Sequence, residues 1–254
     1  MIVKADTNLV DELCPACNVE PRRSGMRPGI LLLHYTGVVT AAKAIDWLSR
    51  ADSQVSCHYV IDERGRIVQM VAEEHRAWHA GVASWAGETD INSASIGIEI
   101  HNPGHSLGYP DFPELQLAAV EALARDIQAR HTIKPERVLA HSDVAPRRKI
   151  DPGEKFPWAR LAAAGVGHWV EPTPIDAAEP AEDLYLDALR LAEVQRLFGA
   201  YGYGLEPTGC LDADTRFVVK AFQRHFRPAR VDGRLDRSTL ATLERLLAAL
   251  QLSA

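Results

Sequence analysis

The sequence is short of the residues that mark disulfide-rich, membrane-spanning and nucleic-acid-binding proteins. It contains 4 cysteines and 7% aromatic residues in 254 residues. A formal net charge of −6 and a pI of about 5.9 argue against a basic stripe for nucleic acid. Apolar runs such as "GILLLHY" fall well short of the ~20 residues that span a bilayer. What remains is an ordinary globular composition, with 46% apolar and 24% charged residues.

The N-terminus lacks a recognisable leader. Acidic residues occupy the part of "MIVKADTNLVDELC" where a signal peptide would carry an apolar region. The chain as given is therefore expected to be cytoplasmic. The alternative is the periplasm or cell envelope, reached after removal of a leader or by a non-classical route.

Two of the cysteines form a short motif, Cys14-Pro-Ala-Cys17, while Cys57 and Cys210 have no close sequence partner. The C-x-x-C spacing is that of half a zinc ribbon or of a redox pair. The sequence has no second C-x-x-C, and no thioredoxin-like strand and helix surround this one. We therefore expect incidental thiols, with a local disulfide between Cys14 and Cys17 as the alternative.

A segment rich in Pro, Ala, Asp and Glu divides the chain. Residues 170–183, "VEPTPIDAAEPAED", lack apolar periodicity and predict a linker. We expect a larger domain over residues 1–169 and a smaller one over residues 184–254. A chain of 254 residues is long enough for two such domains.

The larger domain alternates strand-like and helical segments. The expected strands lie within residues 29–36, 57–71, 94–101 and 137–141, the second range folding back at a turn over 63–65. A helix is expected over 113–131, with Pro113 in its first position. Its predicted apolar stripe comprises Leu115, Ala118, Ala119, Ala122, Leu123 and Ile127. Strands interleaved with helices indicate an α/β fold with a mixed central β-sheet flanked by helices.

The smaller domain contains an internal repeat. Residues 209–215 and 233–239 both read G-x-L-D-x-x-T, which places Asp212 and Asp236 to cap a following helix. With one preceding helix, this predicts a compact C-terminal bundle of three short helices. The apolar positions expected to pack are Leu191, Val194, Leu197, Phe198, Phe217, Val218, Ala221, Phe222, Phe226, Leu240, Leu243, Leu246, Leu247 and Leu250.

No catalytic constellation lies in this smaller domain, so its residues predict a binding or spacer module. Through "VQRLFGAYGY", "GCLDADTRFVVKAFQRHF" and "VDGRLDRSTLATLERL" it resembles the peptidoglycan-binding module found at the ends of many bacterial wall hydrolases. The resemblance covers nearly the whole domain and implies peptidoglycan as a partner.

Two histidines and a carboxylate stand at the ends of buried segments of the larger domain. His34 ends the apolar run "LLLH", His141 ends "VLAH", and Asp151 follows ten residues later. Two imidazoles and a carboxylate, with a fourth position left open, are the ligand number of a catalytic zinc site. Taken singly, His34 suits a core histidine and Asp151 a simple turn. Together, with Lys149 beside Asp151, they predict one metal site.

The larger domain also resembles a known family. The runs "LLLHYTG", "CHYVIDERGRIVQMVAEEHRAWHAG", "NSASIGIEIHNPG" and "AHSDVAPRRKIDPGEKFPW" are similar, in the same order, to the zinc-dependent N-acetylmuramoyl-L-alanine amidases related to AmpD and AmiD. The resemblance spans roughly residues 15–165. Animal peptidoglycan recognition proteins and phage lysozyme-type amidases share that fold.

The resemblance implies one zinc ion and functions for eight residues. They are the zinc ligands His34, His141 and Asp151; the catalytic Glu99 and Lys149; and Trp78, His79 and Asn92, which line the substrate groove. The pair Arg147-Arg148 departs from the more usual Gly-Arg, which leaves the shape of this loop open but not its ligand.

The chemistry of these residue types agrees with the resemblance. Zinc lowers the pKa of a water from about 15.7 to about 7 and polarises a carbonyl. Glu99 would take a proton from that water and pass one to the leaving amine. Lys149 would neutralise the developing oxyanion, which is commonly worth ~3 kcal/mol for a single donor. Taken alone, Glu99 reads as a surface residue on a half-exposed strand and Lys149 as a solvated cation.

The remaining histidines are expected to serve the fold. His58 is expected beside the ligands or in the core. His101, two residues from Glu99, is expected either at the edge of the site or as an unexplained polar residue. Surface or packing positions are expected for His75, His105, His131, His168 and His225.

The sequence therefore predicts an N-acetylmuramoyl-L-alanine amidase. It would hydrolyse the amide between the lactyl group of N-acetylmuramic acid and L-alanine, in peptidoglycan or in (anhydro)muropeptides. The alternative is a non-catalytic peptidoglycan-recognition protein on the same fold, usually marked by loss of a metal ligand, and none is lost here. An unrelated zinc hydrolase would leave the smaller domain without a function. Stem-peptide preference and oligomeric state are not predicted.

Overall fold

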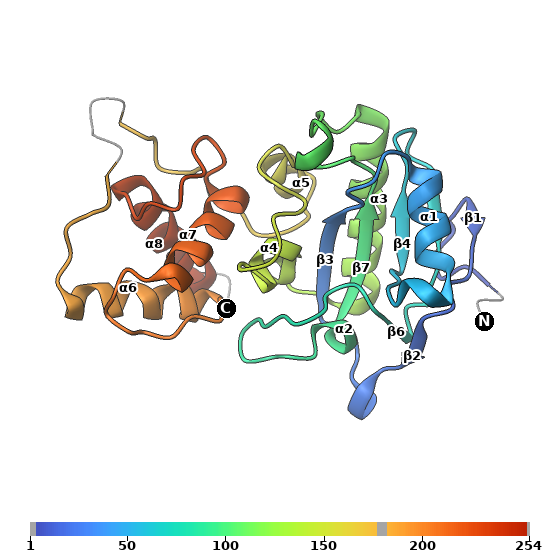
Figure 1. Cartoon of the computed structure of the whole chain (residues 1–254), viewed down its shortest axis with the longest axis horizontal. Helices are drawn as coiled ribbons and strands as arrows, with labels where there is room; N and C mark the ends of the chain where they lie inside the picture. The colour runs from blue at the N-terminus through green and yellow to red at the C-terminus, as the bar shows by residue number, and fades with distance from the viewer. Residues whose placement is uncertain (1–3, 177–181, 253–254) are drawn as a thin grey trace.

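The structure is a computed structural model that describes residues 4–176 and 182–252. It has two parts, a sheet with helices on both faces and a bundle of three helices (Figure 1). The strands are β1 (Glu12–Leu13), β2 (Val19–Pro21), β3 (Ile30–Tyr35), β4 (Tyr59–Ile61), β5 (Ile67–Gln69), β6 (His75–Ala77), β7 (Ser95–Ile100) and β8 (Val138–Ala140). The α-helices are α1 (Ala41–Ser49), α2 (Ile91–Ala94), α3 (Glu114–His131), α4 (His141–Val144), α5 (Trp158–Ala163), α6 (Ala188–Tyr201), α7 (Ala213–Phe226) and α8 (Arg237–Leu252).

The larger part is built on a six-stranded sheet in the order β1-β5-β4-β7-β3-β8. β3 pairs in parallel with β7 on one side and with β8 on the other. β4 pairs in parallel with β7 but antiparallel with β5, so the sheet is mixed, as predicted. A separate antiparallel pair joins β2 and β6. Because β3, β7 and β8 run in the same direction, their carboxyl ends meet at one edge of the sheet.

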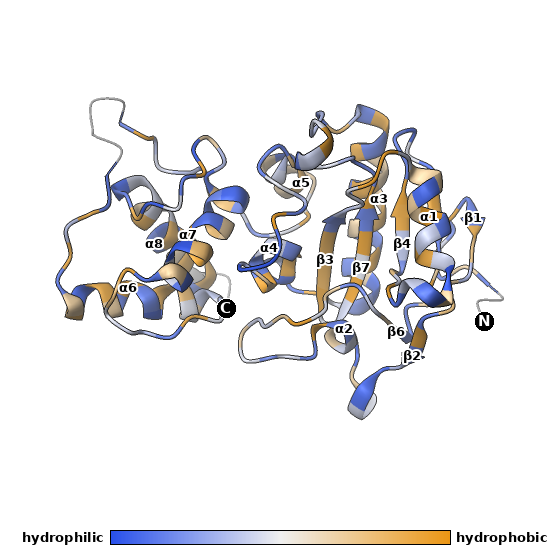
Figure 2. Cartoon of the chain, viewed as in Figure 1, coloured by the Kyte–Doolittle hydropathy of each residue, from blue (hydrophilic) through white to orange (hydrophobic). Residues whose placement is uncertain are grey.

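The central strand β3 is buried on both faces. Ile30, Leu31, Leu32 and Leu33 have no exposed surface. Leu31 and Leu33 pack in the layer that contains α3, whereas Ile30 and Leu32 face the opposite layer. Figure 2 shows the resulting orange run along β3 at the centre of this part. A continuous apolar run is typical of parallel strands that are covered on both sides.

The predicted apolar stripe of α3 is partly wrong. Leu115 is 66% exposed, and Pro113 precedes the helix instead of opening it. The side chain of Gln116 donates to the carbonyls of Ile61 and His101, at 3.2 and 2.8 Å, and so fixes which face meets the sheet. Leucine and valine on that face bury more apolar area than the predicted alanines would. The buried residues are Gln116, Leu117, Val120, Leu123, Ala124 and Ile127.

The last two helices of the smaller part begin at the predicted caps. Asp212 and Asp236 each accept a hydrogen bond from the backbone N–H of the threonine three residues on, at 2.8 and 2.7 Å. These bonds satisfy amides that the first turn of a helix leaves free. One predicted packing position is wrong, because Phe217 is 36% exposed while Val219 is fully buried.

The internal repeat extends to a glutamine in the helix before each cap. The side-chain oxygen of Gln195 accepts from the backbone N–H of Gly209, and that of Gln223 accepts from Gly233, both at 2.8 Å. Each glutamine also donates to the threonine hydroxyl of its own repeat, at 2.8 and 3.2 Å. The same hydrogen-bonding unit is therefore used twice in the bundle.

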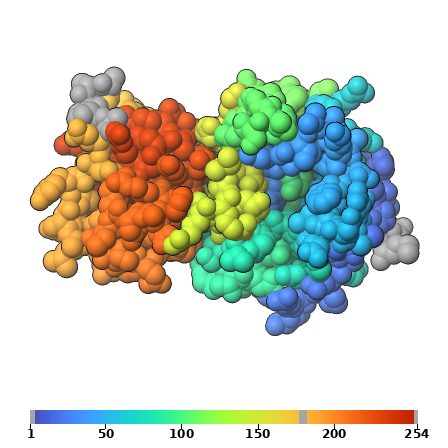
Figure 3. Space-filling view, viewed as in Figure 1, coloured from blue at the N-terminus to red at the C-terminus, as the bar shows by residue number. Residues whose placement is uncertain are grey.

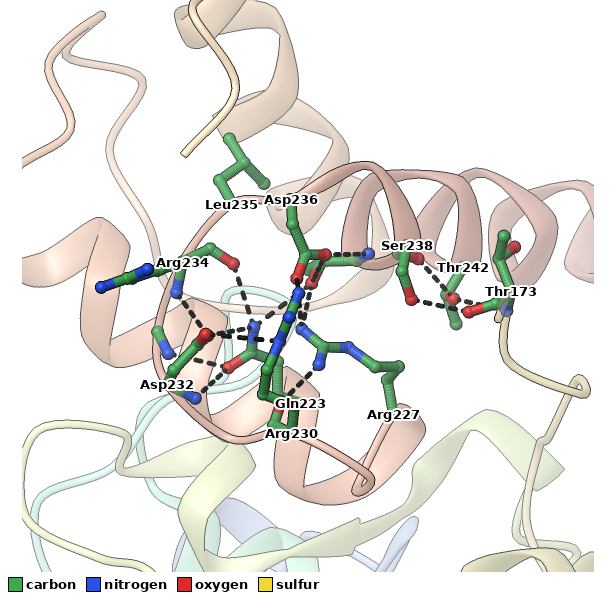
Figure 4. A network of polar contacts seen from close by, with 12 residues as sticks. Thr173, Gln223, Arg227, Arg230, Asp232, Arg234, Leu235, Asp236, Ser238 and Thr242 are labelled. Atoms are coloured by element: carbon green, nitrogen blue, oxygen red, sulfur yellow. Dashed lines mark hydrogen bonds and ion pairs between the residues drawn. The ribbon is translucent and has the colours of Figure 1, made fainter. Parts of the chain in front are cut away.

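A polar network surrounds the second cap (Figure 4). Arg227 and Arg230 both pair with Oδ2 of Asp236, at 3.0 and 2.6 Å. Arg227 is only 1% exposed, and it also donates to the hydroxyl of Thr239 at 2.7 Å. A buried guanidinium is tolerated because acceptors of this kind surround it.

The predicted linker, residues 170–183, is held against α8 on both sides of its undescribed part. The hydroxyl of Ser238 donates to the carbonyl of Thr173 at 2.6 Å (Figure 4). Asp183 accepts from the backbone N–H of Leu235, just before α8, at 2.9 Å. Residues 177–181 of this segment lie outside the described residues. The exact domain boundaries stay a prediction.

The two parts share one hydrophobic cluster. Trp85, from the loop after β6, packs edge-on against Tyr201 and Tyr203, with ring centroids 6.0 and 4.9 Å apart. An ion pair joins Arg147 to Asp214. Figure 3 shows yellow-green atoms of the sheet part touching orange atoms of the helical part. The helical part is therefore packed onto the sheet part as well as tethered to it.

The four cysteines occupy different environments, from exposed to fully buried. All four cysteines are free, so no disulfide joins Cys14 and Cys17. Cys57 is fully buried with Val60 and Val68 under α1. Within the described residues, none of the helices combines the length and apolar character needed to cross a bilayer.

Glu73 ties the end of α3 to the sheet. Its buried carboxylate accepts hydrogen bonds from the Tyr59 hydroxyl and from Nε2 of His131, both at 2.6 Å, and from Arg130 at 2.7 Å. Burial raises the pKa of this carboxyl, but the three donors outweigh burial and lower the pKa to about 2. The group therefore contributes to stability in its ionised form.

Glu73 predicts a particular acid sensitivity of the fold. Its folded pKa of about 2 lies below the ordinary value of 4.5, so its contribution is present above that ordinary value and is lost as the pH falls toward 2. A shift of this size corresponds to about 3 kcal/mol. Glu73→Gln should lower the free energy of unfolding at neutral pH and flatten its decline between about pH 5 and pH 2. Urea denaturation across this range measures both.

The exposed neighbour Glu74 supplies the matched control. Glu74→Gln should keep the wild-type stability and the wild-type acid decline. An unchanged acid decline in Glu73→Gln would show that this carboxylate is not a main source of the pH dependence.

Candidate active site and metal centre

Three electron-pair donors converge where the carboxyl ends of β3 and β8 meet. His34 lies near the end of β3, and His141 directly follows β8 as the first residue of α4. Nδ1 of His34 is 2.8 Å from Nδ1 of His141. Oδ2 of Asp151 is 3.0 Å from Nδ1 of His141 and 3.3 Å from that of His34. All three side chains are buried, and within residues 4–176 and 182–252 no other such group of donors lies close enough to hold an ion.

These donors fit a metal ion. Ligand atoms bonded at about 2.0–2.1 Å to a tetrahedral zinc lie about 3.3 Å apart, close to the spacings here. Burial and the nearby His141 lower the pKa of His34 to about 4, which keeps the imidazole neutral at physiological pH. Burial raises the pKa of Asp151, but the two histidines outweigh it, so this carboxyl is ionised. Lone pairs that face one point in this way repel one another unless a cation lies between them.

Hydrogen bonds behind the histidines fix which nitrogen faces the ion. Nε2 of His141 is 3.0 Å from the carbonyl oxygen of Ala80, which can only accept, so Nε2 carries the proton and Nδ1 is free. Nε2 of His34 is 3.0 Å from Nδ1 of His79, and with Nδ1 of His34 facing the ion it is Nε2 that carries the proton and donates. Nε2 of His79 in turn contacts the hydroxyl of Ser95 at 3.4 Å. Such outer contacts orient the ligands and set their tautomers.

The space for His79 exists because β7 carries a glycine. A Cβ atom on Gly97 would lie 2.6 Å from Nδ1 of His79, which is closer than real Cβ contacts come. Gly97 lies beside Leu32 in the register of β3 and β7, on the face that also carries His34. Because side chains alternate along β7, the same face carries Gly97, which leaves space for the ring of His79, and Glu99 two residues later.

Glu99 lies beside His34 in the parallel register of β7 and β3, so both side chains project from the same face. Its Oε2 atom is buried and has no hydrogen-bond partner among the described residues. Burial, and secondly the charge of Asp151, raise the pKa of Glu99 well above its ordinary value, while Lys149 opposes the shift. A buried carboxyl with an unused oxygen is suited to exchange protons with a ligand.

Two of the donors, His141 and Asp151, border a cavity of about 320 Å³. Its other walls include Tyr35, Thr36, Trp47, Trp78, Glu99 and Lys149. A second cavity of about 460 Å³ continues past Trp78 and Lys149 to Asn92. Trp78 borders both, and its indole N–H is buried with no partner in the part of the chain that the structure describes.

The structure brings the eight predicted residues together, but the side chains of two of them, His79 and Asn92, hydrogen-bond to other groups of the protein. His79 supports His34, as described above. The side-chain oxygen of Asn92 accepts from the backbone N–H groups of His79 and Ala80, at 3.0 and 2.8 Å. Asn92 therefore holds the loop over residues 79–80, in which the carbonyl of Ala80 accepts from His141. Trp78 keeps its hydrogen-bonding group available at the cavity wall.

Sequence reasoning missed several contributors to the site. The carbonyl of Ala80 and the hydroxyl of Ser95 act through contacts that have no sequence pattern. Tyr35 and Trp47 line the cavity and were not predicted. Trp47 is 47% exposed and lies outside the buried positions of the amphipathic helix α1 (Ala41, Ala44 and Leu48), so the available signal was a large aromatic residue off the apolar stripe of a helix.

The other histidines occupy supporting positions. His58 is fully buried, accepts from the backbone N–H of Gly97 at 3.0 Å and packs edge-on against His79, in agreement with the prediction of a core residue. His101 is buried, and its Nδ1 contacts the hydroxyl of Thr36, a residue that lines the first cavity, at 3.1 Å. The remaining five are partly buried (His75, His105, His131 and His168) or buried (His225).

The sequence matches two family models. Residues 24–154 match the N-acetylmuramoyl-L-alanine amidase model, which covers all eight predicted site residues. Residues 189–243 match the model of a peptidoglycan binding domain, which covers most of the helical bundle.

Similar proteins cover nearly the whole chain. N-acetylmuramoyl-L-alanine amidase AmiD of Escherichia coli K12 is 40% identical over 236 residues, or 86% of this chain and 82% of that protein. The structure of E. coli AmiD with anhydro-N-acetylmuramic acid-L-Ala-D-gamma-Glu-L-Lys matches with a TM-score of 0.76 at 37% identity, over 91% of this chain and 92% of that one. The complex of AmpDh3 from Pseudomonas aeruginosa with anhydromuramic pentapeptide gives 0.75 at 33% identity, over 98% and 99%. The chain therefore belongs to the N-acetylmuramoyl-L-alanine amidase family and is an enzyme of this class.

Proposed function

We propose that the chain hydrolyses the amide between the lactyl group of N-acetylmuramic acid and L-alanine, using one Zn²⁺ held by His34, His141 and Asp151. The observation that carries the proposal is the convergence of three buried donors beside Glu99, whose Oε2 is unpartnered within the described residues. A structural zinc site would close with a fourth protein ligand. Here a cavity of about 320 Å³ lies beside the donors instead.

The residues around the donors divide the work of amide hydrolysis. A bound Zn²⁺ supplies acidity to the attacking water and polarises the substrate carbonyl. Glu99 takes the proton of that water and passes it to the nitrogen of the departing L-alanine. Its raised pKa suits a group that must release the proton as well as take it. Lys149, at the cavity wall, stabilises the negative charge that develops on the carbonyl oxygen.

Of the three predicted groove residues, one contacts the substrate and two support other residues of the site. Trp78 borders both cavities with an indole N–H that has no partner within residues 4–176 and 182–252, so we assign it direct contact with substrate. His79 and Asn92 act behind it, the first by orienting His34 and the second by holding the loop over residues 79–80.

The helical bundle is proposed as a second point of attachment to peptidoglycan. The match of residues 189–243 to a peptidoglycan binding domain supports this function. The division into 1–169, 170–183 and 184–254 belongs to the same proposal. The solved relatives hold anhydro-muropeptides, and we infer that this chain accepts such soluble fragments as well as intact wall.

Glu99→Gln separates chemistry from metal binding. The variant should retain one zinc per chain because no donor is altered, and its kcat should fall by about 10²–10⁴ because the proton-transfer group is gone. Release of stem peptide from an anhydro-muropeptide, followed by chromatography, measures the rate, and elemental analysis measures zinc. Glu74→Gln, at an exposed position, is the matched control and should keep full activity.

The same assay tests the non-catalytic alternative. Wild-type protein that carries zinc and binds muropeptide but releases no peptide would support a recognition protein. Full activity in Glu99→Gln would remove this residue from the mechanism.

Attachment through the bundle predicts a wall interaction that soluble fragments do not block. Inactive Glu99→Gln protein should sediment with purified sacculi, and much of that binding should persist with excess soluble anhydro-muropeptide, because the active site alone is then occupied. Quantifying protein in pellet and supernatant measures this. Complete release by the soluble fragment would show that the active site is the sole attachment point.

A further inference from the structure

A buried carboxylate on α4 joins the metal centre to the helical bundle. Asp143 has no exposed surface and lies two residues after His141. Its Oδ2 accepts from Nδ1 of His225 at 2.7 Å, and its Oδ1 accepts from the hydroxyl of Tyr203 at 2.7 Å. Both donors belong to the bundle, so the carboxylate of one part is satisfied by side chains of the other.

The same carboxylate fixes the start of α4. Oδ2 of Asp143 also accepts from the backbone N–H of Ala140, the residue immediately before His141, at 2.8 Å. Within α4, the backbone N–H of Ser142 donates to the carbonyl of Asp151 at 3.0 Å. Any displacement of α4 would therefore move two of the three metal donors relative to His34.

The donor from His225 is itself held in place by aromatic packing. Its ring stacks against Trp158 of the sheet part, with centroids 3.7 Å apart, and against Phe226, with centroids 3.8 Å apart. The residue is 2% exposed, so its Nδ1 is shielded from bulk solvent. A buried carboxylate that loses its donors is strongly destabilised, which favours any rearrangement that brings it to water.

We propose that Tyr203 and His225 are positioning residues for the metal centre: by holding Asp143 they fix α4 and with it the donors His141 and Asp151. The bundle is then part of the active-site scaffold in addition to any contact with the wall. This inference rests on the proposed metal site. It predicts that metal affinity depends on two side chains from the bundle, neither of which is a metal ligand.

The test is a full-length double variant, Tyr203→Phe with His225→Phe, which removes both donors and keeps aromatic rings at both positions. Its affinity for Zn²⁺, measured by competition with a chromophoric chelator, should fall by about tenfold or more, the loss usual for contacts behind metal ligands. The visible spectrum of the Co²⁺ form should change as well, because the geometry of the donors changes. Tyr203→Phe alone, the milder change, should lower Zn²⁺ affinity by a smaller factor.

Tyr201→Phe is the matched control. Its hydroxyl contacts Nδ1 of His168 at 2.9 Å, across the same interface, whereas the side-chain donors to Asp143 among the described residues are Tyr203 and His225. This variant should unfold at a lower temperature yet keep the wild-type Zn²⁺ affinity and Co²⁺ spectrum. Wild-type Zn²⁺ affinity in the double variant, or an equal loss in Tyr201→Phe, would overturn the inference while leaving the metal site intact. Failure of the wild-type chain to bind zinc would instead refute the proposed site on which the inference rests.

Discussion

The parallel register of β3 between β7 and β8 is the constraint on which the site depends. It sets Glu99 beside His34 and ends β8 one residue before His141. A shift of one residue in either pairing would turn Glu99 to the opposite face or carry His141 away from His34. The sheet therefore fixes the separations of the reactive groups, and the loop that follows β8 has only to return Asp151 to them.

The alternation of side chains along β3 and β7 places apolar residues in the core and also places the reactive side chains on one face of the sheet. On β3, Leu31 and Leu33 pack toward α3 while His34 shares the other face with Ile30 and Leu32. Burial then acts on the polar groups of that face. It keeps His34 neutral and raises the pKa of Glu99 well above its ordinary value, so one packing arrangement prepares both a ligand and a proton acceptor.

Patterns within short stretches of the sequence predicted the features that depend on neighbouring residues. The apolar runs predicted β3, β4, β5, β7 and β8, and the repeat predicted the caps at Asp212 and Asp236, because a strand face and an N-cap are set by neighbours in the sequence. The short strands β1, β2 and β6 lie outside the predicted ranges. The predicted stripe on α3 was partly wrong because a pattern of apolar residues does not include Gln116. The side chain of Gln116 donates to the carbonyls of Ile61 and His101 and so determines which face of α3 is buried. The support of Asp143 by the bundle joins residues 60 and 82 positions apart. Contacts of that kind have no signature in a single sequence.

The central claim is that two imidazoles and one carboxylate hold a single zinc. X-ray absorption at the zinc edge of the loaded protein tests it most directly, because nitrogen and oxygen ligands at about 2.0–2.1 Å are distinguished from sulfur at about 2.3 Å. The account predicts a first shell of nitrogen and oxygen with the outer scattering of two imidazole rings. A sulfur ligand from any of the four free cysteines, or the absence of imidazole scattering, would contradict it.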